Sequence, residues 1–202
     1  MLIGIGIGPG DPELLTMRAV RLIREADIVF VPGEVAKTII APYRTDAKIL
    51  SFPMTEDEDE IRRCMIANAG MIAPVAQKGL AVFCILGDPN FFGTFPRLCE
   101  MISERYPDIS FSSVPGISAI TAFASVAGEA VSGGFSVSDG SPDRARVLLK
   151  VRKPKAAADA LRKEGFSRFV LVERMYMTGE HVYRDDDLPA ESSYFSILYA
   201  RR

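Results

Sequence analysis

Hydrophobic and polar positions are arranged in blocks, with short apolar runs separated by longer amphipathic stretches. The runs at residues 1–7, 27–31 and 80–86 predict buried strands. The last of them, "LAVFCIL", is apolar throughout, as is typical of a central strand in a parallel sheet. The acidic run "TEDEDE" at residues 55–60 suits the first turn of a helix, and we expect a solvated helix start there rather than a metal site.

Apolar residues at helical spacing lie between these runs and predict helices that alternate with the strands. Further strands are expected at residues 47–52, 109–114, 146–151, 168–174 and 193–200. Helices are expected at residues 12–25, 35–43, 55–77, 91–105, 118–127 and 154–163. This alternation indicates an α/β fold. The composition changes near residue 115, so we expect an N-terminal α/β lobe over residues 1–114 and a C-terminal α/β lobe over residues 115–202, with a cleft between them.

The Gly-rich segment "GIGIGPGDPELLT" directly follows the first predicted strand. A dinucleotide-binding loop needs glycine at relative positions one, three and six, but the sixth residue counted from Gly4 or Gly6 is Pro9 or Asp11. The Gly-Lys-Ser/Thr tripeptide of a phosphate-binding loop is also missing from the chain. Because Asp11 precedes Pro12, we expect it to cap a helix N-terminus, where a phosphate would otherwise bind. The loop therefore favours a neutral or cationic ligand.

The tripeptide Gly-Asp-Pro recurs at residues 87–89, directly after the most apolar strand, and a third small-residue turn, "VPGIS", starts at residue 114. In open parallel sheets, ligands bind beyond the carboxyl ends of the strands. Either Gly-Asp-Pro segment alone is more simply explained as a tight turn from strand to helix. Both segments together with the third turn favour a shared crevice lined with backbone amides and carboxylates.

These motifs, in this order, resemble the tetrapyrrole methyltransferases that use S-adenosylmethionine in cobalamin and sirohaem synthesis. The matching segments are "GIGPGDPELLTMRAVRLIREADIVF", "LGDPNFFGTF", "VPGISAITAFASVAG", "VLLKV" and "VERM", which cover most of the chain. Among the members of the family, "GDPNFFGTF" and "VLLKVRKP" with "VERM" look most like the precorrin-2 or cobalt-precorrin-2 C(20)-methyltransferases.

The resemblance implies a two-lobed tetrapyrrole methyltransferase fold, with a parallel sheet in the first lobe, a mixed sheet in the second lobe and S-adenosylmethionine in the cleft of a homodimer. The cofactor-binding residues that it implies are Pro9, Leu86, Gly87, Asp88, Phe91, Ser118, Ala119 and Leu149. S-adenosylmethionine carries a sulfonium, an ammonium and a carboxylate but no phosphate, which agrees with the chemistry of the first loop. Members of the family have an acidic residue after the second strand. The segment around Gly33 and Glu34 aligns poorly with that position, so the resemblance assigns no catalytic residue.

Charge and composition narrow the classes of function. The net charge of −2 gives no reason to expect nucleic acid or an anionic membrane as partner. The chain has no membrane-spanning apolar run and no basic leader, so we expect a cytoplasmic protein. Cys64, Cys84 and Cys99 form no Cys-x-x-Cys pair and are expected to be buried, free thiols. The single histidine, His181, lies in a polar, loop-like stretch, where we expect an exposed bystander and no metal site.

Methyl transfer from a sulfonium to an electron-rich tetrapyrrole carbon requires mainly positioning and exclusion of water, so no side-chain nucleophile is expected. The substrate would carry many carboxylates. Basic residues that are candidates to bind them are Arg62, Arg63, Arg97, Arg144, Arg146, Lys150, Arg152 and Lys153. Three other functions stay open: methylation of another corrin intermediate, methylation of a protein by a diphthamide-type enzyme of the same fold, and a catalytically silent binding role.

Overall fold

The computed structural model describes residues 1–202, which form two compact units, Met1–Phe135 and Ser136–Arg202. The first unit extends beyond residue 114, where the change in composition places the end of the first lobe. One physical reason is that Gly116, just past that position, packs against Gly6 and Gly87 at the strand ends of the first unit.

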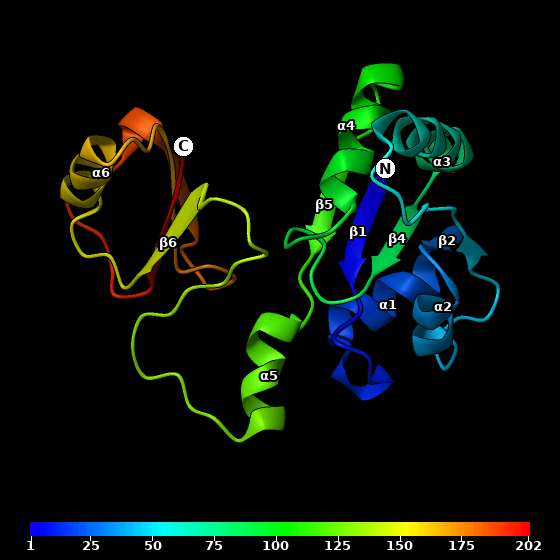
Figure 1. Ribbon diagram of the computed structural model, residues 1–202, viewed down its shortest axis with the longest axis horizontal. Coiled ribbons are helices and arrows are strands. Elements are labelled where there is room, and N and C mark those ends of the chain that lie inside the picture. Colours follow the sequence, from blue (N-terminus) through cyan, green and yellow to red (C-terminus); the bar gives the residue numbers. More distant parts are fainter. The chain divides into compact units, whose positions relative to one another are not determined.

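The first unit is built on a five-stranded sheet with the strand order β3-β2-β4-β1-β5 (Figure 1). Its strands are β1 (Leu2–Gly6), β2 (Ile28–Val31), β3 (Lys48–Ile49), β4 (Ala81–Ile85) and β5 (Phe111–Val114). All neighbouring strands are parallel, and Ile5 of β1 lies opposite both Cys84 and Val114. As its composition predicts, β4 lies inside the sheet and is buried at every position.

Helices cover both faces of this sheet. One face packs against α3 (Glu58–Lys78) and α4 (Phe95–Arg105), and the other face packs against α1 (Met17–Glu25) and α2 (Glu34–Ile40). The alternation of side chains along β4 explains the two layers. Phe83 joins the core beneath α3 and α4, whereas its neighbour Cys84 joins the core beneath α1 and α2.

The helix predicted over residues 12–25 is wrong in its first third. Residues Pro12–Leu14 form a single 3-10 turn, and α1 begins only at Met17. Thr16 sets this start, because its hydroxyl oxygen accepts a hydrogen bond from the Ala19 N–H group at 3.1 Å. The positive end of the α1 dipole therefore lies at Thr16.

Asp11 caps the short 3-10 turn, since its carboxylate accepts a hydrogen bond from the Glu13 N–H group at 2.9 Å. The expectation that it caps a long helix is thus wrong. The physical consequence is that Asp11 places a negative charge in the first loop without occupying the N-terminus of α1.

The start of α3 is confirmed, because the Asp57 carboxylate accepts hydrogen bonds from the backbone N–H groups of Asp59 and Glu60. Besides α1, several elements are shorter than predicted, and β3 and α4 differ most. The strand expected at residues 47–52 is reduced to the two residues of β3. The helix expected from residue 91 begins at Phe95, because residues 91–94 form the turn that leads out of β4.

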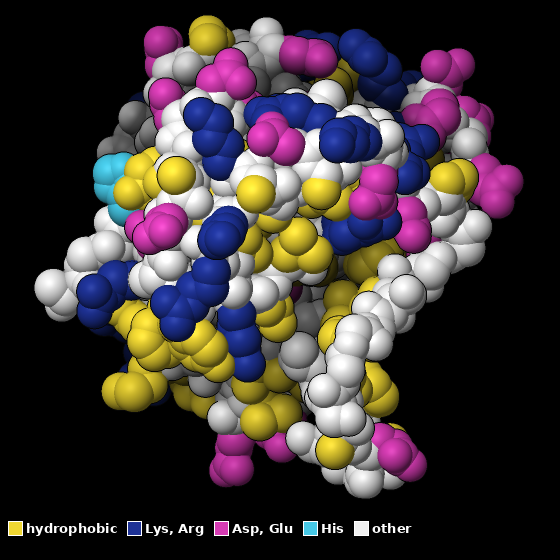
Figure 2. All heavy atoms as spheres, turned by 90° about the vertical axis from the view of Figure 1, so that its left-hand side faces the viewer, with side chains coloured by type: hydrophobic (Ala, Val, Ile, Leu, Met, Phe, Trp, Pro, Cys, Tyr) yellow, Lys and Arg dark blue, Asp and Glu magenta, His cyan; other side chains and the backbone are white.

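The second unit is a four-stranded sheet with the order β6-β9-β7-β8, on which α6 (Pro154–Lys163) packs. Its strands are β6 (Ala145–Leu149), β7 (Arg168–Glu173), β8 (His181–Arg184) and β9 (Ser196–Arg201). The sheet is antiparallel throughout and not mixed as expected, because β9 lies between β6 and β7 and runs opposite to both. Basic and hydrophobic side chains lie side by side on the face of the molecule that Figure 2 shows.

The helix expected near residues 118–127 is α5 (Ala119–Ala127), which belongs to the first unit. It ends at Gly128, whose φ of +70° is the left-handed conformation that favours glycine after a helix. None of its residues is buried. No helix of the protein combines the length and the apolar character needed to cross a membrane.

Candidate functional site

The carboxyl ends of β4, β1 and β5 lie side by side, because these strands are parallel neighbours. The connection after β1 leads to α1 on one face of the sheet, whereas the connection after β4 leads to α4 on the opposite face. Ligands of open α/β sheets bind at the carboxyl edge where neighbouring connections leave on opposite faces. The three loops identified in the sequence therefore meet at the edge where a ligand is expected.

Three glycines join these loops so closely that a larger residue does not fit. A Cβ atom on Gly6 would lie 2.4 Å from the carbonyl oxygen of Gly87 and 2.5 Å from the nitrogen of Gly116. A Cβ atom on Gly116 would lie 2.1 Å from the same oxygen. Such distances are well inside van der Waals contact. The glycines thus allow the backbones of three loops to touch.

Two backbone hydrogen bonds join the segments at the ends of β1 and β4, and the second of them belongs to an isolated antiparallel bridge between Gly8 and Gly87. Ile7 N donates to Ile85 O at 2.9 Å, and Gly87 N donates to Gly8 O at 2.8 Å. Gly8 and Gly87 have φ values of +77° and +67°, which a residue with a side chain rarely adopts. This bridge fixes the residues that follow it, so the first two loops are held as one rigid edge.

Asp88 ties the second loop to the third. Its side chain is 8% exposed, and its Oδ1 accepts a hydrogen bond from Asn90 N at 2.9 Å. Its Oδ2 accepts a hydrogen bond from Gly116 N at 3.2 Å. Both carboxylate oxygens therefore have partners within the protein, and Asp88 connects the second loop to the third.

The other sequence-predicted residues of the first two loops offer an apolar surface. Leu86 and Phe91 are 41% and 55% exposed, and Pro9 is half-buried. Phe92, which is not among the predicted site residues, is 68% exposed and has a φ of +51°. Left-handed backbone at a bulky residue is costly and occurs most often where function requires it. No signal in the sequence other than the pair of adjacent phenylalanines points to this strain.

The third loop leads directly into α5. Ser118 caps this helix, because its hydroxyl oxygen accepts a hydrogen bond from Ile120 N at 3.2 Å, and Ala119 is the exposed first residue. These two residues thus belong to the same edge as the first two loops. Leu149 is the exception, since it ends β6 in the second unit, where it is 66% exposed.

The charge of the loops determines which ligand fits. Residues 7–16, 86–94 and 114–118 include no Lys, Arg or His, whereas Asp11, Glu13 and Asp88 are acidic. A site for a nucleotide phosphate normally supplies a cation or a free helix N-terminus. An apolar edge with carboxylates and exposed backbone instead fits S-adenosylmethionine, which combines a thioether-like sulfonium, an adenosine and an ammonium group.

The remaining candidates for reactive groups are the histidine and the cysteines. No group of three or more His, Cys, Asp or Glu side chains is arranged to hold a metal ion. His181 belongs to the strand β8 and not to a loop as predicted, but it is exposed, and its ring lies 4.3 Å from that of Tyr183 between centroids. All three cysteines are free, although only Cys84 is fully buried as predicted.

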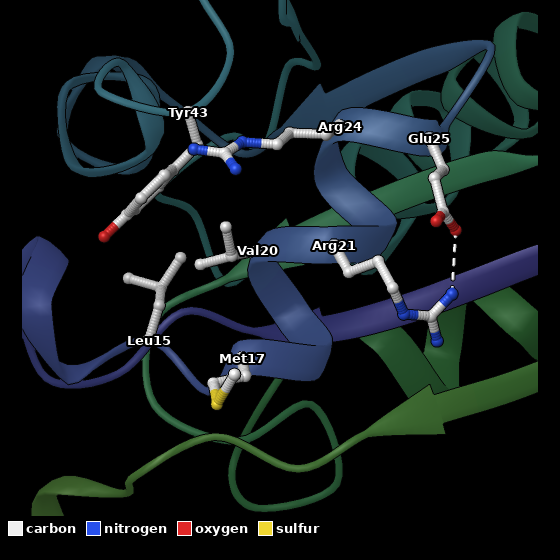
Figure 3. Close-up of a pocket in the computed structure, with 7 residues that line it drawn as sticks. All are labelled: Leu15, Met17, Val20, Arg21, Arg24, Glu25 and Tyr43. Carbon is white, nitrogen blue, oxygen red and sulfur yellow. Dashed lines mark hydrogen bonds and ion pairs between the residues drawn. The ribbon is translucent and has the colours of Figure 1, made fainter.

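A separate surface pocket of about 480 Å³ lies against α1 (Figure 3). It is lined by Leu15, Met17, Val20, Arg21, Arg24, Glu25 and Tyr43. Arg21 forms an ion pair with Glu25 at 2.8 Å, and Tyr43 donates a hydrogen bond to the carbonyl oxygen of Pro12 at 2.9 Å. None of the residues predicted to bind the cofactor lines this pocket.

Comparisons with known proteins agree with the motifs. The sequence model of the tetrapyrrole (corrin/porphyrin) methylases matches residues 1–186. The chain is 31% identical to the cobalamin biosynthesis protein CbiHC of Archaeoglobus fulgidus over 134 residues, which are 66% of this chain and 28% of that protein. It is 37% identical to the siroheme synthase of Nitrosomonas eutropha over 125 residues, 61% of this chain and 25% of that protein. The matched region thus spans little more than a quarter of these relatives.

Solved structures share the fold. A cobalamin-synthesis-related protein, CobF, from Corynebacterium diphtheriae aligns with a TM-score of 0.53 at 15% identity, over 100% of this chain and 98% of that chain. The methyltransferase CobJ aligns with a TM-score of 0.51 at 18% identity, over 100% of this chain and 93% of that chain. Because the family model covers nearly the whole chain, the protein belongs to the tetrapyrrole (corrin/porphyrin) methylase family, whose members are methyltransferases that use S-adenosylmethionine.

Proposed function

We propose that this protein transfers a methyl group from S-adenosylmethionine to carbon 20 of precorrin-2 or cobalt-precorrin-2 in cobalamin biosynthesis. The observation that carries the proposal is the meeting of three loops without basic residues at the carboxyl ends of β4, β1 and β5, in a chain of the tetrapyrrole methylase family. The choice of carbon 20 is supported by the segment "GDPNFFGTF", which forms the loop after β4.

The bound cofactor supplies an electrophilic methyl group on its sulfur atom. In this proposal Leu86 and Phe91 provide apolar contacts, while Pro9, Gly87 and the start of α5 at Ser118 and Ala119 present backbone groups to the cofactor. Asp88 holds the second and third loops together through its two hydrogen bonds. The assignment of Leu149 to the cofactor stays a prediction from the resemblance.

The chain has no need to provide a nucleophile, because a reduced tetrapyrrole supplies one from its own conjugated ring. Its task is to hold the acceptor carbon in line with the methyl group and to exclude water, an effect that reaches roughly 7–11 kcal/mol for well-oriented reactants. The three loops suit this task, since their glycine contacts and the Asp88 hydrogen bonds leave them little freedom to move. We further propose a homodimer that acts in the cytoplasm.

A second candidate is methylation of another tetrapyrrole. It is favoured by the 37% identity to a siroheme synthase and the 31% identity to the cobalamin biosynthesis protein CbiHC, neither of which is named for precorrin-2. The two candidates use the same cofactor loops and differ only in the acceptor.

The test is to incubate the purified protein with S-adenosylmethionine labelled in the methyl group and with one acceptor at a time. The acceptors are precorrin-2, cobalt-precorrin-2 and uroporphyrinogen III, and mass spectrometry and NMR identify the methylated carbon. The proposal expects a single new methyl group on carbon 20 of precorrin-2 or of its cobalt form. Methylation of uroporphyrinogen III alone would support the second candidate, and no transfer to any tetrapyrrole would contradict both.

A further inference from the structure

A second group of unusual residues lies at one end of the sheet in the second unit. The strands β6 and β7 both pair antiparallel with β9, so they run in the same direction and end beside the start of β9. Leu149, the last residue of β6, lies opposite Ile197, and Glu173, the last residue of β7, lies opposite Ser196. Residues that follow β6 and β7 are thus brought to the residues that precede β9.

The backbone at this end is strained. Lys150 directly follows β6 and Arg174 directly follows β7, and Tyr176 lies two residues further on; their φ values are +59°, +51° and +62°. Residues with side chains keep such a conformation only where the surrounding structure holds it, most often at functional sites. Two hydrogen bonds to the start of β9 hold it here, from Lys150 N to Ser196 O at 2.8 Å and from Arg174 N to Phe195 O at 2.7 Å.

Two cations at this end share one aromatic ring and have no carboxylate partner. Lys150 Nζ lies 5.2 Å and Arg152 Cζ lies 5.7 Å from the centroid of the Tyr194 ring. No Asp or Glu oxygen lies within 4.0 Å of either cation, whereas Arg146 in the same sheet is paired with Glu164 at 2.7 Å. The carboxylate that ends β7, Glu173, accepts a hydrogen bond from Ser193 N at 2.7 Å.

Exposed apolar side chains surround the two cations. Leu149, Tyr194 and Phe195 are 66%, 46% and 56% exposed, and the rings of Tyr194 and Phe195 meet edge to face with centroids 5.4 Å apart. Unpaired cations next to exposed aromatic rings suit a ligand that is both anionic and broadly apolar. A tetrapyrrole with carboxylate side chains on an apolar macrocycle has this combination.

We propose that Lys150, Arg152 and Tyr194 form a binding site for carboxylate side chains of the tetrapyrrole substrate, with Phe195 in contact with its macrocycle. This inference rests on the proposed function and names residues of the chain that recognise the acceptor. Hydrogen bonding to Tyr194 raises the pKa of Lys150 above its ordinary value, so Lys150 remains a cation at neutral pH. Arg152 is always charged, and the pair offers donors to two carboxylate oxygens at least.

Lys150→Gly is the most informative variant, because glycine suits a φ of +59°. The variant removes the charge of Lys150 and relieves the backbone strain. If Lys150 only stabilised the fold, losing its side chain should lower the stability, whereas a binding role predicts weaker tetrapyrrole binding at unchanged or higher stability. Arg152→Gln is a second variant, and Arg146→Gln is the matched control, since Arg146 also lies over an aromatic ring, that of Phe166, but has its own carboxylate partner.

The readouts are the KM for the tetrapyrrole, kcat, the Kd for S-adenosylhomocysteine by calorimetry, and the quenching of uroporphyrin fluorescence on binding. Losing a hydrogen bond between charged groups corresponds to roughly a tenfold loss of affinity. We expect Lys150→Gly and Arg152→Gln each to raise the KM and the Kd for uroporphyrin about tenfold. The unfolding midpoint of Lys150→Gly should not fall, and the fully methyl-esterified porphyrin should bind the wild-type protein and both variants equally weakly.

Three results with the variants would overturn the inference. One is an unchanged KM and porphyrin Kd in both variants, and another is equal losses in Arg146→Gln. The third is weaker binding of S-adenosylhomocysteine, seen as a higher Kd, with unchanged binding of the porphyrin. That result would assign the cluster to the cofactor. A wild-type protein that binds S-adenosylhomocysteine but no porphyrin would refute this site while leaving the cofactor loops intact. Binding of neither ligand would refute the proposed function itself.

Discussion

The carboxylate of Asp88 accepts a hydrogen bond from the backbone nitrogen of Gly116 at 3.2 Å, across the carboxyl edge of the first sheet. The two residues follow β4 and β5, which are separated in the sheet by β1. One buried side chain therefore joins two loops that are not adjacent in the sheet.

Asp88→Ala should weaken cofactor binding by loosening this edge. The variant leaves the N–H groups of Asn90 and Gly116 without their acceptor, which costs about 1–3 kcal/mol of folding free energy. The affinity for S-adenosylhomocysteine should fall roughly ten- to a hundredfold. Urea unfolding measures the first effect and calorimetry the second.

Asp11→Ala is the matched control for Asp88→Ala. Asp11 is also the aspartate of a Gly-Asp-Pro loop, but it is exposed and caps only the 3-10 turn through Glu13 N. Removing its carboxylate should cost about 0.5–2 kcal/mol of folding free energy. No hydrogen bond between two loops is lost in this variant. Equal losses of cofactor affinity in both variants would show that Asp88 has no special part in holding the edge.

Gly116→Ala should distort the same edge through steric contact alone. The new Cβ would lie 2.1 Å from the carbonyl oxygen of Gly87, so the loops must move apart. Overpacking of this kind typically costs about 1–3 kcal/mol. Gly133→Ala is the control, since its Cβ would meet no atom within 4 Å. A Gly116 variant as stable as the Gly133 variant, with unchanged cofactor affinity, would contradict the close packing of the loops.

Much of this site was predictable because strand ends of a parallel sheet coincide in space. The Gly-Asp-Pro repeats and the "VPGIS" turn each follow an apolar run, and the structure brings them together at β4, β1 and β5. The carboxylate chemistry of Asp88 was not predictable, because the residue that it binds is 28 positions away in the chain. Sequence spacing identifies Asp88 as a turn residue but gives no sign that Gly116 is its partner.

The errors at helix starts have a local cause. The pattern of apolar residues from 12 to 25 is compatible with one helix, but Asp11 caps the 3-10 turn and Thr16 caps α1, which divides the segment. The antiparallel second sheet has a non-local cause, since the position of β9 between β6 and β7 depends on the last strand of the chain. Lys150 and Arg152 could be identified as candidates from sequence. Other candidates, such as Arg63 and Arg144, also lack an ion pair, and only the Tyr194 ring that Lys150 and Arg152 share separates these two from them.

S-adenosylmethionine and S-adenosylhomocysteine should bind to the protein, whereas NAD and ATP should not. The loops at the carboxyl edge contain no cation, and the start of α1 is occupied by its own Thr16 cap, so a phosphate would meet carboxylates without compensation. Calorimetry with the four ligands under identical conditions measures the difference. Tight NAD binding together with no response to S-adenosylhomocysteine would refute this assignment of the edge.

The cysteines should differ in their reaction with iodoacetamide. Burial raises the pKa of Cys84, and burial together with Glu100 raises the pKa of Cys99 to about 12. A raised pKa keeps a thiol neutral at pH 8, and only the thiolate reacts. We therefore expect Cys64 to be alkylated at least about tenfold faster than Cys84 or Cys99 in the folded protein, and the reaction at Cys99 to accelerate as the pH rises. Mass spectrometry of the labelled peptides measures the rates, and similar rates at all three positions would contradict this burial pattern.

His181→Ala should keep methyl transfer within a few-fold of the wild-type rate. His181 lies on β8, opposite Glu173 in the register, and is exposed with its ring against Tyr183. The tetrapyrrole supplies its own nucleophile in the proposed reaction, so no histidine must gain or lose a proton. General acid–base catalysis typically contributes about 10²–10⁴ in rate. A mechanism that uses His181 and one that does not therefore differ in rate by far more than the assay error. Single-turnover rates at saturating cofactor make the comparison. A fall of about a hundredfold or more, in a folded variant that still binds S-adenosylhomocysteine, would show that His181 takes part in proton transfer.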